Sequence, residues 1–251
     1  NGSYKACFPG VTEELVEEAL KKIFSDQNNG LHDPKNAESW VFFTLSMIHK
    51  ELKSRGRERN RNQIKHAIEV MSSCIITLYD EDNKELWKGS ILQDLITVGR
   101  DKYLEDSDSK HAARLPSFIS HSINTLEYRQ FNFERLMSCN EQLSRWVYKQ
   151  LINRYTQANH INSYHFSFTR ISDESGLLQT ATIRKARQKV SSALGELKEK
   201  GVIYSYEEEN KYEGRKIVDV TYIVKPSPEF ITEQKAANKR ASDSKLKLPT
   251  P

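Results

Sequence analysis

The sequence predicts an α+β, mostly helical fold in which one plan occurs twice: two helices joined by a turn, then a β-hairpin. Apolar residues recur at three- and four-residue steps through residues 183–197, which indicates an amphipathic helix. Apolar residues then alternate on both sides of a charged turn in residues 202–224, which indicates a hairpin. A basic turn, a helical segment and two short apolar runs follow one another in the same order in residues 55–87. This plan describes a winged helix, so we predict two tandem winged-helix domains.

A chain of 251 residues is long enough for one large or two small cores. We predict an N-terminal winged-helix domain over residues 1–136 and a C-terminal one over residues 137–230. After the prolines that end the last strand, we expect residues 231–251 to begin helically and then to form a basic tail that is disordered without a partner.

The first domain is expected to begin with a helix over residues 12–25 and a loop. Apolar side chains at helical spacing predict a second helix from Glu38 to Ser54. Asn60 and Gln63 have the spacing of a capping box, which places the start of a third helix at Arg61. The remaining elements are a hairpin from IITLY and ELW, a strand in residues 90–100, a polar loop in 101–114 and a short helix in 115–124.

The second domain is expected to begin with a helix that a capping box of Ser138 and Glu141 initiates. Residues 161–171 are predicted to form a short strand or the approach to a helix, and residues 171–180 a turn-rich segment. The basic helix then runs from Thr182 to Gly201, where a left-handed glycine ends it. Its predicted buried stripe consists of Ile183, Ala186, Val190, Ala193, Leu194 and Leu197.

The polar face of this helix carries the first candidate site, which is suited to DNA. Arginine can bind guanine and glutamine can bind adenine in the major groove, and threonine hydroxyls can contact phosphate. The candidate residues on and before the helix are Thr180, Thr182, Arg184, Lys185, Arg187, Gln188 and Lys189, and those at the hairpin tip are Lys211, Arg215 and Lys216. The alternative is an ordinary solvated helix face.

The basic turn of the first domain carries the second candidate site. Arginines and a lysine alternate there with side chains that can form hydrogen bonds, a pattern that would neutralise several phosphates. The candidate residues are Arg55, Arg57, Arg59, Asn60, Arg61, Gln63 and Lys65. The alternative is a basic surface between domains or between two copies of the chain.

We expect no enzymatic activity, no cofactor and no metal. The sequence lacks GxxxxGK[ST], the loop that cradles nucleotide phosphates, and it has no pair of histidines separated by one apolar residue. His160 and His165 lack nearby cysteine partners for zinc. The acidic residues between Asp101 and Asp108 leave a Mg²⁺-dependent nuclease as an alternative, although a flexible polar loop explains them more simply.

The absence of a long apolar run predicts a cytoplasmic protein that does not enter a membrane. Cys7, Cys74 and Cys139 are isolated thiols, which fits a reducing compartment. The chain begins at Asn1 and not at Met, which is consistent with a longer parent protein.

Several segments resemble the RepA-type replication initiators of large bacterial plasmids. They are FTLSMIHKELKSRGRERNRNQIKHAIEVMSSCIITLY, SILQDLITVGRDKYL, LPSFISHSINTLEYRQFNFERLMS, QLSRWVYKQL and KVSSALGELKEKGVI, and the resemblance runs from about Phe8 to Asn238. In that family two winged-helix domains contact DNA and one surface forms a dimer. The resemblance implies that the helix from Thr182 to Lys200 reads a repeat and that residues 60–74 are its counterpart. This chain departs from the pattern in its arginine-rich turn before Asn60.

The predicted function is that of a bacterial cytoplasmic initiator that binds direct repeats in double-stranded origin DNA. It would promote opening of the origin, recruit host replication proteins and take part in plasmid copy control. The protein could also form a homodimer, which the sequence neither requires nor excludes. The alternatives are a winged-helix transcriptional repressor without a replication role, which would use the same DNA-binding surface, and a scaffold whose winged helices bind proteins.

Overall fold

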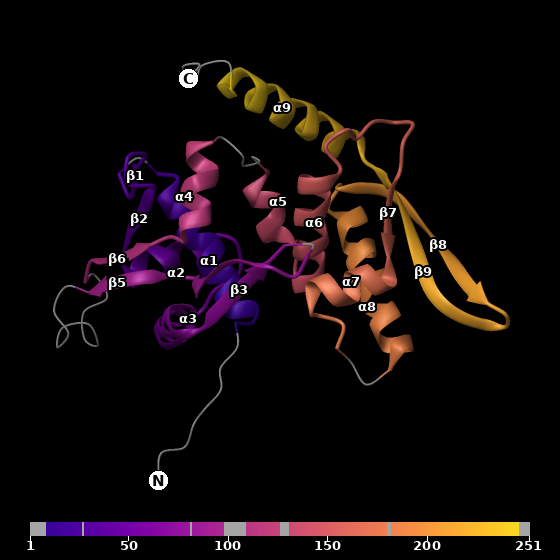
Figure 1. The fold of residues 1–251 in the computed structure, drawn as a ribbon, viewed down its shortest axis with the longest axis horizontal. Helices are drawn as coiled ribbons and strands as arrows, with labels where there is room; N and C mark the ends of the chain where they lie inside the picture. Colours follow the sequence, from indigo (N-terminus) through magenta and orange to yellow (C-terminus); the bar gives the residue numbers. More distant parts are fainter. Residues whose placement is uncertain are drawn as a thin grey trace, which may run out of the picture. The chain divides into compact units, whose positions relative to one another are not determined.

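A computed structural model describes residues 9–26, 28–80, 82–97, 109–125, 131–179 and 182–245. It divides into two compact units, residues 1–128 and 129–251 (Figure 1). The division falls before the predicted boundary at residue 136, because the helix that precedes residue 139 is bonded within the second unit. The side chains of Asn132 and Arg135 donate to the Glu233 carboxylate over 3.1 and 3.0 Å.

Three helices form the core of the first unit: α1 (Val11–Phe24), α2 (Leu45–Lys53) and α3 (Arg61–Ser73). Each packs against the other two. Their apolar stripes are fully buried, as the helical spacing predicted, and include Leu15, Leu20, Ile48, Ile64 and Ile68. A fourth helix, α4 (Ser117–Asn124), packs against the sheet of this unit.

The sheet of the first unit has four antiparallel strands in the order β1-β2-β6-β5. They are β1 (Gly30–Asp33), β2 (Glu38–Phe43), β6 (His111–Arg114) and β5 (Gln93–Thr97). A separate hairpin of β3 (Ile75–Tyr79) and β4 (Glu85–Ser90) follows α3, where the sequence predicted it.

Two predictions for this unit are wrong. The predicted helix from Glu38 to Ser54 is a strand followed by a helix, because Ser39, Val41 and Phe43 alternate into the interior and Thr44 then caps α2. The Thr44 hydroxyl accepts a hydrogen bond from the Met47 amide over 3.1 Å. The predicted polar loop ends in a strand, since β6 pairs with β2 and β5; its acidic residues 101–108 lie outside the described residues.

In the second unit, four helices precede or separate the strands of a three-stranded antiparallel sheet of order β7-β9-β8, and a fifth helix follows the sheet. The elements are α5 (Phe133–Ser138), α6 (Gln142–Arg154), β7 (Tyr164–Ser167), α7 (Phe168–Ser175), α8 (Ile183–Glu199), β8 (Ile203–Glu213) and β9 (Lys216–Pro226). Helices α6 and α8 pack together over a core that contains Val147, Leu151, Val190 and Leu194. Helices α7 and α8 form a helix-turn-helix that the β8–β9 hairpin follows, and of these elements α8 and the hairpin lie where the sequence predicted them.

Three local predictions in this unit need correction. Helix α6 does not begin with a capping box of Ser138 and Glu141, because Ser138 ends α5 and Glu141 is itself the N-cap; the amides of Asn140 and Glu141 donate to the Glu196 carboxylate of α8. The first half of the predicted turn-rich segment, residues 171–175, belongs to α7, whose C-cap Gly176 has a left-handed φ of +64°. Ile183, predicted to be buried, is 72% exposed, and the buried stripe of α8 begins at Ala186.

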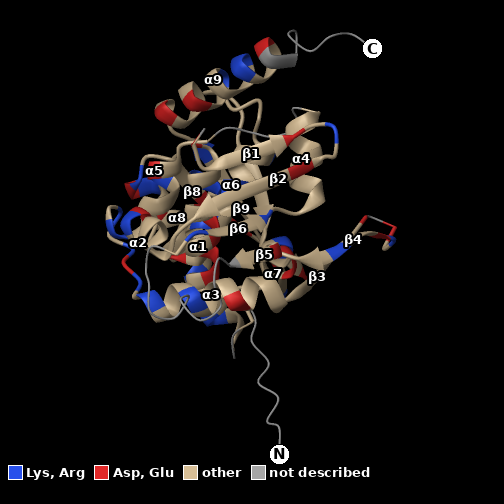
Figure 2. Ribbon diagram, turned by 90° about the vertical axis from the view of Figure 1, so that its left-hand side faces the viewer, with Lys and Arg blue, Asp and Glu red and all other residues tan. Residues whose placement is uncertain are grey.

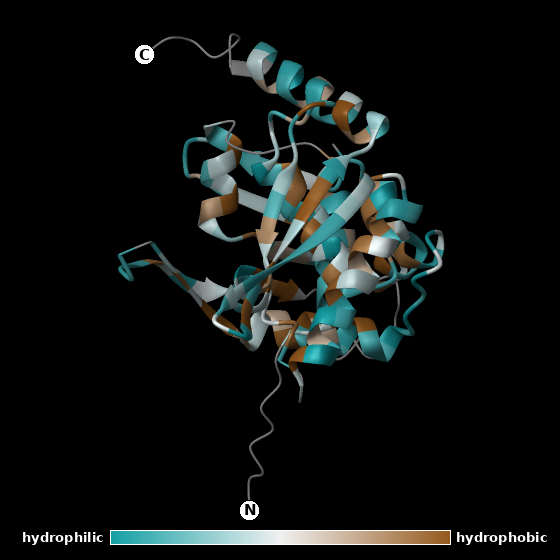
Figure 3. Ribbon diagram, turned by 90° about the vertical axis from the view of Figure 1, so that its right-hand side faces the viewer, coloured by the Kyte–Doolittle hydropathy of each residue, from teal (hydrophilic) through white to brown (hydrophobic). Residues whose placement is uncertain are grey.

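A helix, α9 (Pro228–Lys245), follows the sheet, so the predicted helical start is confirmed, but the helix continues to residue 245 where a disordered tail was expected. Phe230, Ile231, Gln234 and Ala237 recur at helical spacing and are buried. The hydrophobic residues of this helix are concentrated near its start (Figure 3). Residues 246–251 lie outside the described residues.

Candidate nucleic-acid interface

Helix α8 presents a polar face to solvent at its start. Thr182 caps the helix, since its hydroxyl accepts a hydrogen bond from the Lys185 amide over 3.3 Å. Ala186 and Val190 anchor the opposite side of the helix in the core. The predicted site residues Thr182, Arg184, Lys185, Gln188 and Lys189 are all exposed. Thr180 lies outside the described residues.

Arg187 departs from that group, because it is bonded to the following hairpin. Its Nη2 donates to Asn210 Oδ1 over 3.0 Å and lies 3.4 Å from Glu208 Oε2. Ser191 Oγ donates to Glu208 Oε1 over 2.6 Å, so two side chains of α8 hold one carboxylate of β8. The expectation that Arg187 points freely into solvent is therefore wrong, and the residue fixes the hairpin to the helix.

Strands β8 and β9 form a long hairpin, which we call the wing. Gly214 has a φ of +60° and permits the tight turn between them. The predicted contact residues Lys211, Arg215 and Lys216 are exposed around this turn. The wing and the start of α8 thus carry two basic surfaces within one unit.

A groove with a volume of about 440 Å³ lies between the starts of α7 and α8 and strand β9. Its lining is partly apolar, from Phe168, Ile183, Ile217, Val218 and Val220, and partly polar, from Thr169, Arg184, Arg187 and Asp219. The Asp219 carboxylate accepts hydrogen bonds from the amides of Thr169 and Val220 over 3.1 and 2.8 Å. Both bonds are accepted by Oδ1, so this oxygen of the carboxylate is directed at the backbone.

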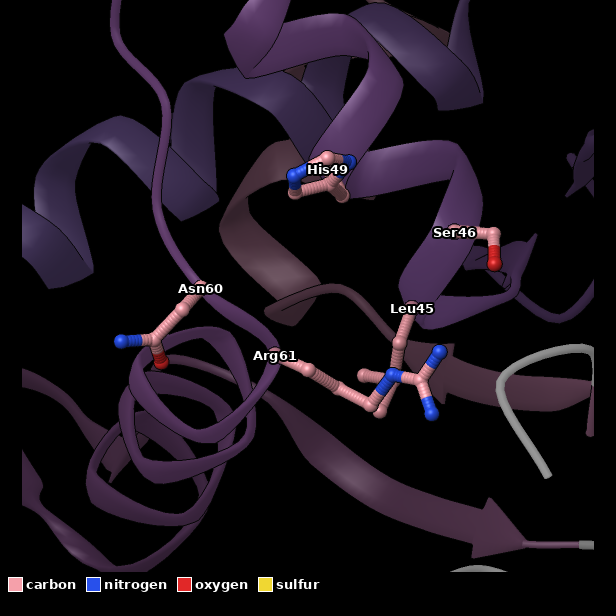
Figure 4. Close-up of a pocket in the computed structure, with 5 residues that line it drawn as sticks. All are labelled: Leu45, Ser46, His49, Asn60 and Arg61. Carbon is pink, nitrogen blue, oxygen red and sulfur yellow. The ribbon is translucent and has the colours of Figure 1, made fainter. Parts of the chain in front are cut away.

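In the first unit, α2 and α3 form the second helix-turn-helix. The predicted capping box is confirmed: the Gln63 amide donates to Asn60 Oδ1 and the Asn60 amide to Gln63 Oε1, both over 2.9 Å. Both side chains remain exposed, but they first serve the helix start. Arg61 is exposed beside them. It lines a pocket of about 280 Å³ with Leu45, Ser46, His49 and Asn60 (Figure 4).

The arginine-rich turn before α3 is tied largely to its own unit. The Arg55 side chain is only 14% exposed and pairs with Glu51 over 2.9 Å. Arg59 Nε donates to Thr12 Oγ1 over 3.3 Å, and Lys65 lies 3.8 Å from Glu69. Arg57 is half-buried. Basic and acidic residues are interspersed around α2 and α3 (Figure 2).

These contacts change the predicted second site. Glu58 lies 3.2 Å from His49 and 3.3 Å from Lys53, and hydrogen bonding from Lys53 holds the pKa of its carboxyl below the usual value. The expectation of a turn whose arginines all face outward is wrong. The exposed part of the predicted site is the start of α3, with Arg61 at its centre.

Within the described residues, no group of three or more His, Cys, Asp or Glu side chains has the geometry to hold a metal ion. His160 and His165 belong to that searched set. No helix in the same part of the chain combines the length and apolar character needed to cross a membrane.

No protein-family model and no curated protein matches the sequence. Among solved structures, the chain is similar to the crystal structure of the Pi initiator protein in complex with iteron DNA. The TM-score is 0.56 at 12% identity, over 87% of this chain and 95% of that one. The two chains share a fold. The predicted resemblance to replication initiators is therefore confirmed for the fold of the chain, including its two winged-helix units.

A second similar structure contains domains 2 and 3 of RctB. It covers 86% of this chain and 81% of the other at 12% identity. Its TM-score of 0.46 is too low to support a shared fold.

Proposed function

We propose that this protein is a sequence-specific DNA-binding replication initiator whose two helix-turn-helix units bind repeated origin sequences. The observation that carries the proposal is the exposed basic start of α8 beside the basic tip of the wing. Its support from known proteins is the fold shared with the Pi initiator, whose crystal structure contains iteron DNA.

The arrangement in the second unit divides the work of recognition between two elements. A recognition helix enters the major groove with its N-terminal residues toward the base edges. Arg184, Lys185 and Gln188 occupy that part of α8 and are exposed, so they supply base and phosphate contacts. Arg215 and Lys216 at the wing turn would contact the flanking backbone. Such a unit binds duplex DNA without performing any bond chemistry.

The first unit adds a second, smaller contact through Arg61 and the exposed side-chain amides of Asn60 and Gln63 at the start of α3. Once one unit is bound, the other acts at a high effective concentration along the same duplex. Repeated origin sequences offer such neighbouring sites. We therefore include direct repeats among the proposed ligands, and host replication proteins as the partners that the bound protein would recruit.

The proposal is tested first by selection of a duplex. The full chain is incubated with a pool of random-sequence duplexes, and the enriched sequence is used as the probe for affinity measurements. Because a specific arginine contact contributes about 1–3 kcal/mol, Arg184→Glu with Lys185→Glu should weaken binding at least about tenfold. The matched control is Lys198→Glu, an exposed lysine in the last turn of the same helix, which should change affinity less than about twofold. The proposal would be overturned if no duplex were enriched, or if the two variants bound the enriched duplex with equal affinity.

Initiation is separated from simple repression by distortion of the duplex. The enriched sequence is cloned as direct repeats in a supercoiled plasmid, and unpaired thymines are detected with permanganate after the protein is bound. An initiator that promotes opening should produce reactive thymines beside the repeats. Protection of the repeats without reactive thymines would favour the repressor alternative.

A further inference from the structure

Ile183 is the least expected side chain at the candidate interface. It is the first residue of α8 and is 72% exposed, although the helix buries its other apolar residues from Ala186 onward. An isolated exposed isoleucine is common on protein surfaces and needs no explanation. Ile183 is not isolated, because it shares the groove beside the wing with Ile217 and Val218, which are 40% and 42% exposed.

The surroundings of this apolar surface indicate the chemistry of its occupant. Exposed cations lie next to it on the helix and at the wing turn: Arg184, Lys185, Lys189, Arg215 and Lys216. The acidic member of the groove, Asp219, accepts hydrogen bonds from two backbone amides. A partner that fits must therefore be a polyanion that also exposes apolar groups.

Duplex DNA meets both requirements through thymine, whose C5-methyl group projects into the major groove. Double-stranded RNA does not, because its major groove is too deep and narrow for a helix to reach the bases. The first residues of a recognition helix lie closest to the base edges. Ile183 holds that position in α8.

We propose that Ile183 determines sequence specificity by contacting the C5-methyl group of a thymine. This inference rests on the proposed DNA-binding function and adds to it the base that the apolar part of the interface reads. Arg184, Lys185 and Gln188 contribute charge and hydrogen bonds, whereas Ile183 contributes an apolar contact that is lost when the methyl group is absent.

The test uses the duplex that the full chain enriches from the random pool. Each thymine is replaced singly by deoxyuridine, which removes the methyl group and keeps the base pair. Burial of one methyl group predicts that the wild-type chain binds at least one such duplex about three- to tenfold more weakly. Ile183→Ala should bind the thymine duplex as weakly as the uracil duplex and should no longer distinguish them.

Ile161→Ala is the matched control, because Ile161 is 96% exposed in the same unit and precedes β7, which pairs with the end of β9 remote from the wing turn. It should keep both the affinity and the discrimination of the wild-type chain. Both variants remove an exposed side chain, so their urea unfolding curves should match that of the wild-type chain.

The two proposals fail in different ways. If no duplex is enriched, DNA binding itself is contradicted and the inference about Ile183 falls with it. If a duplex is enriched but every uracil substitution is neutral, only the thymine contact is overturned. The same holds if Ile183→Ala still discriminates thymine from uracil as strongly as the wild-type chain.

Discussion

Arg145 is the clearest case of a charged side chain that serves the fold. It is fully buried on α6, and its Nη1 donates to the carbonyl oxygens of Cys139 and Asn140 over 2.9 and 3.1 Å. These carbonyls follow α5, so the guanidinium fixes the connection between two helices. The sequence alone does not predict that this arginine is buried. The residues at helical spacing from it would surround an exposed side chain equally well.

We expect Arg145→Ala to lower the free energy of unfolding by about 3 kcal/mol, because it leaves buried carbonyls unpartnered and opens a cavity. Urea denaturation measures the change. Arg154→Ala is the control: Arg154 pairs with Glu174 over 3.0 Å, but at 36% exposure it should contribute about 0.5 kcal/mol. Equal losses in the two variants would contradict a structural role for the buried arginine.

Glu196 explains how α6 begins without a capping side chain of its own. Its carboxylate accepts hydrogen bonds from the amides of Asn140 and Glu141 over 2.5 and 3.2 Å. Burial raises the pKa of Glu196, but hydrogen bonds from the Ser144 hydroxyl and these two amides outweigh it and the net pKa is lowered. A carboxyl whose pKa is lower in the folded state stabilises the fold above its unfolded pKa, and this stabilisation is lost as the pH falls through the folded pKa.

We therefore expect Glu196→Gln to be less stable than the wild-type chain by about 1 kcal/mol at pH 7. The difference should shrink as the pH falls from the ordinary glutamate pKa of about 4.3 through the lower pKa of this carboxyl in the folded chain. Urea unfolding curves at several pH values provide the test. A difference that stays constant with pH would show that the ionised carboxylate is not the stabilising form.

At the scale of elements, the position of the wing depends on Arg187 and Ser191 of α8, which both contact Glu208, and on the bond from Arg187 to Asn210. Beside them lies the buried Tyr222 phenol on β9, whose pKa burial raises to about 12, so that it is neutral at pH 7. Glu208 thus connects the wing to the basic start of α8. A negative charge near DNA should ordinarily weaken binding, but Glu208 organises the surface that we propose to bind DNA.

Glu208→Gln should accordingly weaken binding to the enriched duplex about threefold, because the wing loses its attachment to α8. Its matched control is Glu209→Gln, the exposed next residue on the same strand, which should leave binding unchanged or slightly stronger. Anisotropy titrations at fixed salt compare the two. Stronger binding of Glu208→Gln than of Glu209→Gln would mean that the carboxylate only repels the ligand.

The elements that local patterns specify were predictable from the sequence. The capping box of Asn60 and Gln63, the stripe from Ala186 to Leu197 and the left-handed Gly201, with a φ of +66°, all occur as expected. The predictions failed where a distant partner decides the structure. Residues 38–43 have helical spacing but form a strand because β1 and β6 pair with them, and α9 is ordered because its start packs against Tyr148 and Tyr155.

The same distinction applies to the candidate site. The exposed residues Arg184, Lys185, Gln188 and Lys189 lie on the polar side of a stripe that the sequence displays. The carboxylate partner of Arg187 does not follow from spacing, because Glu208 is 21 residues away and is brought to it by the hairpin. The pair of Arg55 and Glu51 has the i,i+4 spacing of neighbours on a helix and does follow from the sequence. Ile183 was assigned to the core because its spacing is right, although the groove beside the wing leaves it exposed.

At the scale of the whole molecule, the formal net charge is only +4 in 251 residues. A general attraction to polyanions is therefore weak, and the account depends on where the basic residues of each unit are placed. Each unit contributes an exposed helix start, at Arg61 in the first and at Arg184 and Lys185 in the second. Two units on one duplex should neutralise more phosphates than either unit does alone.

The salt dependence of binding to the enriched duplex tests this claim most directly. The slope of log Kd against log salt changes by about 0.9 for each phosphate contact. Arg61→Glu should reduce the slope by about 1, Arg184→Glu with Lys185→Glu by about 2, and the combination by about 3, if each side chain neutralises one phosphate. The controls Lys35→Glu in the first unit and Lys198→Glu in the second should keep the wild-type slope. A slope that stays unchanged in the Arg61 or the Arg184 and Lys185 variant would contradict the claim that both units bind the same duplex.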